Sequence, residues 1–306
     1  MNVIETSGLG KRYGGTWALR ECTLSIPAGQ VVALVGPNGA GKTTLLNVAI
    51  GLVSPSAGGV TVLGGLAPGS PAALDGIAFV AQDVPLYKNL SASDMLHLTH
   101  NLNRFFDTAS AETRLVELGV PLKRKAGRLS GGQQAQLALT LALARRPRLL
   151  LLDEPMAMLD PVARHDFMAA VMTAVADDGV SVVMSSHVLA ELERVADYLV
   201  LISNGSVQVA GEVDELLANH RVLTGPTTNA EADVRSTVVH ARRGEVQAHL
   251  LVRSCADDPV PPGWQAHPVG LEELVLAYMR ESGNAVPSAA SSGRESVTSE
   301  VTKWSR

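Results

Sequence analysis

The chain has 306 residues, of which 46% are hydrophobic and 18% are charged. That balance can supply a buried core, is consistent with about two domains and excludes a wholly disordered chain. The formal net charge of -5 argues against nucleic-acid binding through bulk positive charge, so we expect no nucleic-acid partner. No apolar run reaches the ~20 residues that span a bilayer, so we expect a soluble, cytoplasmic chain. Its two cysteines, Cys22 and Cys255, lie far apart and predict no disulfide framework.

The first pattern along the chain is a strand, a glycine-rich turn and a helix. Apolar residues over 30–35 predict the strand, and an apolar-periodic segment over 42–52 predicts the helix. Further short apolar runs predict buried strands at 59–63, 77–81, 149–152, 180–185 and 198–202. Helical patterns between several of these runs favour an α/β fold with a largely parallel sheet.

A region without strand signals interrupts this alternation. Residues 83–145 predict a helical insertion, with helices near 91–105 and 111–118 and a third in the apolar segment that Pro147 stops. After the last apolar strand, Asn204-Gly205 predicts a hairpin and residues 213–218 predict a closing helix. We therefore expect the main domain to cover residues 1–220.

The character of the chain changes after this point. Residues 234–241 and 246–253 predict two strands of a small α+β extension over 221–282, and a disordered tail is expected over 283–306. An apolar stripe at helical spacing lies within the extension, formed by Leu271, Leu274, Val275, Tyr278 and Met279. This stripe either packs on the extension's own two strands or reaches a partner subunit. Because the extension carries no catalytic or metal-binding motif, we expect it to have a coupling or regulatory role and no catalytic one.

The glycine-rich turn has the pattern of a phosphate-binding loop. It consists of Gly36-Pro37-Asn38-Gly39-Ala40-Gly41-Lys42-Thr43 and lies between a strand and a helix, as that pattern requires. Its glycines let backbone N–H groups face phosphate oxygens at the positive end of the following helix. Lys42 can reach the β- and γ-phosphates, and the Thr43 hydroxyl can ligate Mg²⁺. The expected nucleotide-binding residues of this loop are Gly36, Asn38, Gly39, Gly41, Lys42, Thr43 and Thr44.

Two further motifs fit a nucleotide-hydrolysing site. The strand at 149–152 ends in Asp153, which can hold Mg²⁺, and Glu154, which can polarise a water for attack on the γ-phosphate. Before it, Leu129-Ser130-Gly131-Gly132-Gln133 opens a helical segment with Ser130 as its candidate N-cap. The exposed N–H groups after Ser130 would form a second anion site.

Together these motifs resemble the ATP-binding subunits of ABC transporters, over roughly residues 3–218. The resemblance implies a P-loop NTPase fold and an ATPase that uses ATP and Mg²⁺. It identifies residues 129–133 as the family signature, with Ser130, Gly131, Gly132 and Gln133 acting on the ATP of another chain. It also implies roles for single residues: Tyr13 stacks on adenine, Gln82 senses Mg²⁺ and the attacking water, Asp160 belongs to the loop between subunits, and His187 contacts the γ-phosphate.

The resemblance also implies an assembly. One phosphate loop and one signature per chain imply two ATPase chains, expected as a homodimer, that enclose two ATP molecules. Met156-Ala157-Met158 departs from the family pattern of a small or hydroxyl residue followed by Gly or Ala, and so affects the polar contacts expected across that dimer.

The region 83–90 and the helix 271–279 resemble ATPases that serve multidrug and antibiotic exporters with a separate permease. The implied protein is peripheral on the inner face of the cell membrane and powers export of a small hydrophobic or antibiotic-like compound. Uptake or lipid handling is an alternative within the same architecture. A soluble ATPase of this family without a transport role is a third.

Overall fold

The structure, a computed structural model, describes residues 1–157, 159–187, 189, 192–227, 237–254 and 258–284. Its centre is a six-stranded sheet of order β5-β6-β7-β3-β8-β9. The strands are β3 (Val31–Val35), β5 (Ile77–Val80), β6 (Leu149–Asp153), β7 (Ser181–Ser186), β8 (Tyr198–Ser203) and β9 (Ser206–Glu212). All neighbours pair in parallel except β8 and β9, which are antiparallel and joined by the predicted turn at Asn204-Gly205. The predicted α/β fold with a parallel-rich sheet is confirmed.

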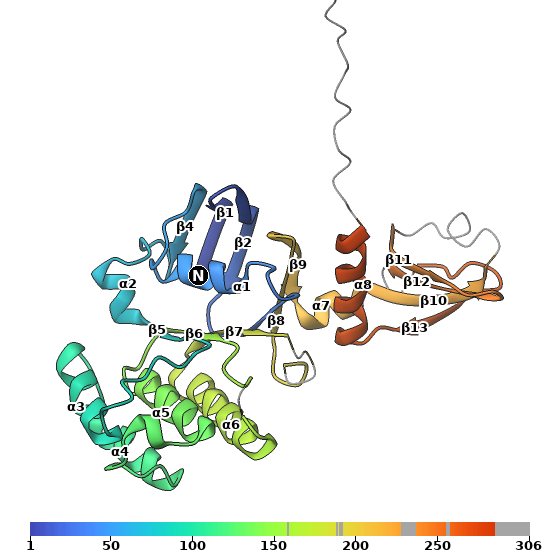
Figure 1. The fold of residues 1–306 in the computed structure, drawn as a ribbon. Coiled ribbons are helices and arrows are strands. Elements are labelled where there is room, and N and C mark those ends of the chain that lie inside the picture. The colour runs from blue at the N-terminus through green and yellow to red at the C-terminus, as the bar shows by residue number, and fades with distance from the viewer. Residues whose placement is uncertain (158, 188, 190–191, 228–236, 255–257, 285–306) are drawn as a thin grey trace, which may run out of the picture.

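The central strands are buried on both faces. Val32 and Leu34 pack into the core that includes α1 (Lys42–Ala49), whereas Ala33 and Val35 pack with α5 (Gly131–Leu143) and α6 (Pro161–Asp178). Figure 1 shows α1 on one side of the sheet and α3 to α6 on the other. Strands buried on both faces appear as continuous apolar runs, which is why the sequence predicts them well.

A second sheet was not expected from the sequence. It has the order β2-β1-β4 and consists of the antiparallel strands β1 (Asn2–Tyr13), β2 (Thr16–Pro27) and β4 (Ala57–Val62). The strand predicted at 59–63 is present as β4, but it is only partly buried, because Gly59 is exposed and Val60 and Thr61 are half-buried. In β1 and β2, buried and exposed residues are mixed and the register shifts several times, so neither strand forms an apolar run.

The helical insertion lies where the sequence predicts it. It contains α3 (Ala92–Leu102), α4 (Thr108–Glu117), a 3₁₀ turn at Ala126–Arg128 and α5, while α2 (Pro71–Gly76) precedes β5. Leu96, Leu115 and Leu137, one from each of the three long helices, form a core of their own. The insertion thus has a core of its own, and α5 also packs on the central sheet.

The extension contains more strands than the sequence predicts. After α7 (Val213–Ala218), four antiparallel strands follow in the order β11-β12-β10-β13, namely β10 (His220–Pro226), β11 (Thr237–Arg243), β12 (Gln247–Arg253) and β13 (Gln265–Pro268). Two strands were expected; β10 was missed because polar residues and Gly-Pro break its pattern, and β13 because it is short and exposed. Residues 234–236 of the predicted first strand lie outside the described residues.

The last helix, α8 (Leu271–Asn284), joins the extension to the main domain. Figure 1 shows it between the extension sheet and the β9–α7 region. Leu271 and Leu274 are fully buried in one core with Phe167 and Leu199 of the main domain, and α8 contacts β8, β9 and α7 as well as β11. The apolar stripe of α8 packs on the strands of the extension, as one of the two predictions has it, and also on the chain's own main domain, which neither prediction included. The helix also continues past residue 282, and the predicted tail from 285 onward lies outside the described residues.

Candidate active site

The residues predicted to act on nucleotide meet at one edge of the central sheet. The phosphate loop follows β3, Gln82 lies just beyond β5, Asp153 ends β6 with Glu154 directly after it, and His187 follows β7. These strands are parallel neighbours, so their carboxyl ends face the same side, where α/β proteins bind ligands. The sheet topology therefore brings together side chains that are far apart in the sequence.

The loop between β3 and α1 is shaped by close backbone contacts. A Cβ atom at Gly36 would collide with the Ile202 carbonyl oxygen, and one at Gly41 with the Ala18 carbonyl oxygen. Gly41 also has a φ of +110° at the N-cap of α1, a conformation that favours glycine. As the N-cap, Gly41 has no side chain that could cap α1, and the first N–H groups of a helix have no intrahelical partner. This uncapped helix start, with Thr43 exposed and Thr44 half-buried in its first turn, can receive an anion.

The Lys42 ammonium group lies inside the loop. Its Nζ donates to the carbonyl oxygens of Gly36, at 2.7 Å, and Pro37, at 3.2 Å, and lies 3.9 Å from Glu154 Oε1. Burial lowers the pKa of Lys42, while the negative charges of Glu154 and Asp153 act in the opposite direction. A buried cation at the mouth of an uncapped helix is well placed to balance phosphate charge. Asn38 and Gly39 stand exposed at the outer side of the same loop.

The carboxylate of Glu154 is the point at which the predicted residues converge. Gln82 Nε2 donates to Glu154 Oε2 at 3.2 Å, and His187 Nδ1 lies 3.3 Å from the same oxygen. With Lys42 at the other oxygen, these residues form what we call the Glu154 cluster (Lys42, Gln82, Glu154 and His187). Glu154 has a φ of +46°, which is uncommon for a residue with a Cβ and is often found at functional sites.

Asp153 is held from the neighbouring strand by a residue that the sequence analysis missed. Asp153 is 1% exposed, and the Ser185 hydroxyl on β7 donates to its Oδ1 at 2.6 Å. The same hydroxyl oxygen accepts the backbone N–H of Glu154 at 2.9 Å. Ser185 pairs with Asp153 in the β6–β7 register. A polar residue after the apolar run Val182-Val183-Met184 is the signal that could have identified it.

The donor set fits a magnesium ion bound together with a nucleotide. Thr43, Gln82 and Asp153 offer hydroxyl, amide and carboxylate oxygens, the ligand types that Mg²⁺ prefers. Because Gln82 uses its amide nitrogen on Glu154, its oxygen is available to another partner. Within the residues that the structure describes, no three His, Cys, Asp or Glu side chains group as a metal site. A cation here would therefore take phosphate oxygens or water as its remaining ligands.

Tyr13 lies apart from the Glu154 cluster, at the tip of the hairpin formed by β1 and β2. Its side chain is half-exposed, and the Lys11 ammonium lies 5.1 Å from the ring centre. The hairpin adjoins the phosphate loop, because β2 supplies the Ala18 and Leu19 atoms that pack against Gly41. An exposed aromatic ring beside the loop is available for stacking on a base.

The predicted signature forms the start of α5. Ser130 Oγ accepts the Gln133 N–H at 3.2 Å, and Gln133 Oε1 accepts the Ser130 N–H at 3.2 Å, which is a complete capping box. Gly131 is exposed and Gly132 half-buried in the first turn. In the described part of the chain, no hydrogen bond joins residues 130–133 to the Glu154 cluster.

Asp160 and the residues before it have structural roles within the chain. The Asp160 side chain caps α6 by accepting the N–H groups of Val162, at 3.0 Å, and Ala163, at 2.9 Å. Met156, part of the departure from the family pattern, is buried in the core shared with α6 and presents no polar group. Ala157 is exposed, and Met158 lies outside the described residues.

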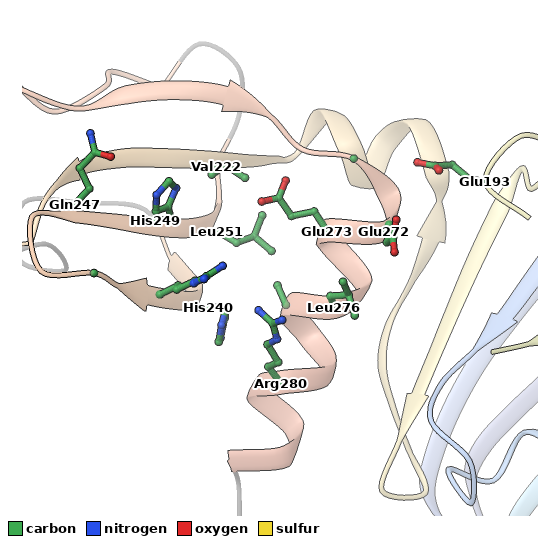
Figure 2. Close-up of a pocket in the computed structure, with 14 residues that line it drawn as sticks. Glu193, Val222, His240, Gln247, His249, Leu251, Glu272, Glu273, Leu276 and Arg280 are labelled. Atoms are coloured by element: carbon green, nitrogen blue, oxygen red, sulfur yellow. The ribbon is translucent and has the colours of Figure 1, made fainter. Parts of the chain in front are cut away.

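Helix α8 lines a groove and a smaller cavity in the described part of the chain. A groove of about 880 Å³ lies between α8 and the extension sheet. Figure 2 shows its lining residues, with Glu272, Glu273 and Arg280 on the helix and His240 on the side of the sheet. None of its lining residues belongs to the Glu154 cluster. A smaller cavity of about 250 Å³ is lined by Gly36 and His187 on one side and by Val275, Leu276 and Met279 of α8 on the other. The extension therefore forms a wall next to the candidate site.

Comparison with known proteins gives a consistent family. Residues 19–157 match the family described as "ABC transporter". The chain is 34% identical over 227 residues to the lantibiotic transport ATP-binding protein SrtF of Streptococcus pyogenes, covering 72% of this chain and 98% of SrtF. It is 36% identical to the Fe(3+) ions import ATP-binding protein FbpC of Pseudomonas fluorescens, over 72% of this chain and 64% of FbpC. The ABC transporter ATP-binding protein YtrB of Bacillus subtilis is 26% identical over 90% of this chain and 97% of YtrB, a match that includes part of the extension.

Solved structures agree with the fold. An ATP binding subunit of an ABC transporter superposes with a TM-score of 0.63 and 28% identity, over 70% of this chain and 91% of that chain. A dimeric bacterial ABC transporter cassette, MJ0796, gives a TM-score of 0.62 and 26% identity, over 69% of this chain and 98% of that chain. In the described residues, no helix combines the length and apolar character needed to cross a membrane.

Proposed function

This chain belongs to the ATP-binding proteins of ABC transporters, a family that hydrolyses ATP, and we propose that it powers the export of a small hydrophobic or antibiotic-like compound through a separate membrane permease. The observation that carries its role as an ATPase is the convergence of Lys42, Gln82 and His187 on the Glu154 carboxylate. This carboxylate lies beside the phosphate loop and the start of α1. ATP is the substrate of this site.

The chain's own residues bind and orient the nucleotide. The backbone of Gly36, Gly39 and Gly41 encloses the phosphates with Asn38 and Thr44 at the rim, Lys42 balances the β- and γ-phosphate charge, and Tyr13 stacks on adenine. Mg²⁺ held by Thr43, Gln82 and Asp153 supplies further charge neutralisation on the phosphate oxygens when it is bound.

Hydrolysis takes place at Glu154. Its carboxylate accepts a proton from a water molecule while the water oxygen attacks the γ-phosphorus in line. The bond from the γ-phosphorus to the β–γ bridging oxygen breaks, and the electron pair of that bond leaves with ADP. Gln82 and His187, both at Glu154 Oε2, hold the carboxylate and the attacking water in position.

The active assembly is a head-to-tail homodimer. Ser130, Gly131, Gly132 and Gln133 of one chain face the γ-phosphate held by the other chain, and Asp160 lies near the contact between them. The separation of residues 130–133 from the chain's own Glu154 cluster supports this arrangement, and the similar MJ0796 cassette is described as dimeric. The dimer works on the inner face of the membrane, docked on its permease.

Export is favoured by the match to SrtF, which is named for lantibiotic transport and is spanned over 98% of its length. Uptake is the second candidate, because FbpC is named for Fe(3+) import and is 36% identical. FbpC is less well matched in length, since the chain spans 64% of it.

The direction of transport can be tested in inverted membrane vesicles that carry the chain with the permease encoded nearest to it. The hydrophobic dye Hoechst 33342 serves as the probe, and vesicles with the Lys42→Ala variant are the control. Export predicts that ATP added outside the vesicles drives dye into the lumen in the wild type and not in the control. ATP-driven loss of preloaded dye would instead support uptake.

A further inference from the structure

Ser185 lies in the middle of the candidate site without belonging to any of its motifs. Its side chain is fully buried at the end of β7, between β6 and β3, and pairs in register with Asp153 and Leu34. A buried hydroxyl is unfavourable unless it is hydrogen-bonded. Here it is bonded twice, and both partners belong to the carboxylate pair.

We infer that Ser185 is a positioning residue that fixes Asp153 and Glu154 relative to each other. This inference rests on the proposed function, in which Asp153 holds the cation and Glu154 is the base. A hydroxyl group has one proton and two lone pairs, so a single Ser185 side chain can donate to Asp153 Oδ1 and accept the Glu154 N–H at the same time.

The first bond sets the direction of Asp153. With Oδ1 bound to Ser185 at 2.6 Å, rotation of the carboxylate is restricted and Oδ2 is the oxygen left to a cation. Hydrogen bonds to a ligating carboxylate typically tune metal affinity, and their loss typically weakens metal binding or activity about 10- to 100-fold. Ser185 therefore acts on the cation through Asp153.

The second bond holds an uncommon backbone conformation. Glu154 has a φ of +46°, which its Cβ makes unfavourable, and the Ser185 oxygen binds its N–H in that conformation. This geometry directs the Glu154 side chain toward Gln82, His187 and Lys42. Without the bond, the backbone can relax and the carboxylate loses its fixed position.

The chain offers a matched control on the same strand. Ser181 is also buried on β7 and its hydroxyl also accepts a backbone N–H, that of Gly29 at 2.8 Å, but at the opposite end of the strand. Ser181→Ala therefore removes a comparable hydrogen bond far from the site. Ser185→Thr is the conservative variant, because threonine keeps the hydroxyl group that makes both bonds.

The test measures Mn²⁺ affinity by electron paramagnetic resonance in the presence of the ATP analogue AMP-PNP, together with kcat and KM for ATP. We expect Ser185→Ala to weaken Mn²⁺ binding and to lower kcat, each about tenfold, with KM for ATP unchanged. Ser181→Ala and Ser185→Thr should resemble the wild type in all three quantities.

Equal Mn²⁺ affinity and kcat in Ser185→Ala and Ser181→Ala would overturn the inference. If circular dichroism shows that Ser185→Ala does not fold, Ser185→Thr decides: wild-type values support the inference, and a folded protein with both values lowered contradicts it.

The wild-type protein tests the proposed function separately. If the wild type binds Mn²⁺ with AMP-PNP but does not hydrolyse ATP, the role of Glu154 fails while the effect of Ser185 on Asp153 is still measured; if it binds no Mn²⁺, both fail.

Discussion

At the scale of single residues, the buried imidazole of His220 is held by specific partners. His220, the first residue of β10, is 2% exposed. Its Nδ1 lies 2.7 Å from the Leu216 carbonyl oxygen, which can only accept, so Nδ1 carries the proton and Nε2 accepts the Tyr278 hydroxyl at 2.9 Å. Arg253 in turn donates to the Tyr278 oxygen at 2.8 Å. This chain of bonds links α7, β10, β12 and α8.

The His220 network predicts a pH-dependent stability. Burial, assisted by the Arg253 charge, lowers the pKa of His220 below its ordinary value of 6.5. As the pH falls below 6.5, the unfolded chain binds a proton that the native state does not, so the free energy of unfolding decreases until the pH passes the native pKa. Above pH 6.5 the neutral imidazole retains its full contribution.

The measurement is urea unfolding at pH 7.5 and pH 5.5 of the wild type, His220→Asn and His97→Asn, in which an exposed histidine is changed. His220→Asn should be less stable at pH 7.5 but should lose less stability on acidification than the other two proteins. The same loss in all three would show that His220 is not the group responsible.

At the scale of elements, the strands that are buried on both faces are the ones that the sequence predicts best. Strands β3, β6, β7 and β8 are apolar on both faces, so their runs of hydrophobic residues identify them without further information. Strands β1 and β2 pair with each other and carry exposed as well as buried side chains. Shifts in their register interrupt the alternation of apolar and polar residues that would identify them in the sequence. Tertiary pairing, which a single sequence does not display, determines such elements.

The same distinction applies to the candidate site. Lys42 and Glu154 belong to motifs whose chemistry requires those residue types, and the structure brings them within 3.9 Å of each other. Ser185 has no motif, because its role depends on which strand lies beside β6. Likewise, the sequence shows that α8 has an apolar stripe but does not show which surface covers it.

Helix α8 allows a direct test of its packing on the main domain. Leu274 is fully buried in the shared core, whereas Leu276, on the same helix, is 42% exposed. Leu274→Ala should lower the free energy of unfolding by about 3 kcal/mol, and Leu276→Ala by less than about 1 kcal/mol, as measured by urea unfolding. Equal effects would contradict the packing described for α8. We also expect truncation after residue 220 to destabilise the main domain, because it removes a layer of its core.

At the scale of the whole molecule, the proposed head-to-tail homodimer completes each site with the phosphate loop of one chain and the signature of the other. Ser130→Arg should leave nucleotide binding by the monomer intact, since no described hydrogen bond connects residues 130–133 with the chain's own Glu154 cluster. The arginine should block ATP-driven dimerisation by placing a bulky side chain where the facing γ-phosphate must dock. Sedimentation velocity with and without ATP measures the fraction of dimer.

The matched control for this test is Ser91→Arg. Ser91 forms the same type of capping box at the start of α3, so the substitution repeats the loss of a helix cap, about 1 kcal/mol, outside the signature. Ser91→Arg should still dimerise with ATP. Normal dimerisation of Ser130→Arg would count against the head-to-tail arrangement.

The central claim is that this chain hydrolyses ATP with Glu154 as the base, and the steady-state ATPase rate of Glu154→Gln tests it most directly. Glutamine keeps the size of the side chain and cannot accept the proton, so we predict normal ATP binding and a kcat lowered by about 10² or more. Glu215→Gln, at an exposed site on α7, should retain the wild-type rate and controls for the loss of one charge. A kcat for Glu154→Gln close to that of the wild type would contradict the assignment.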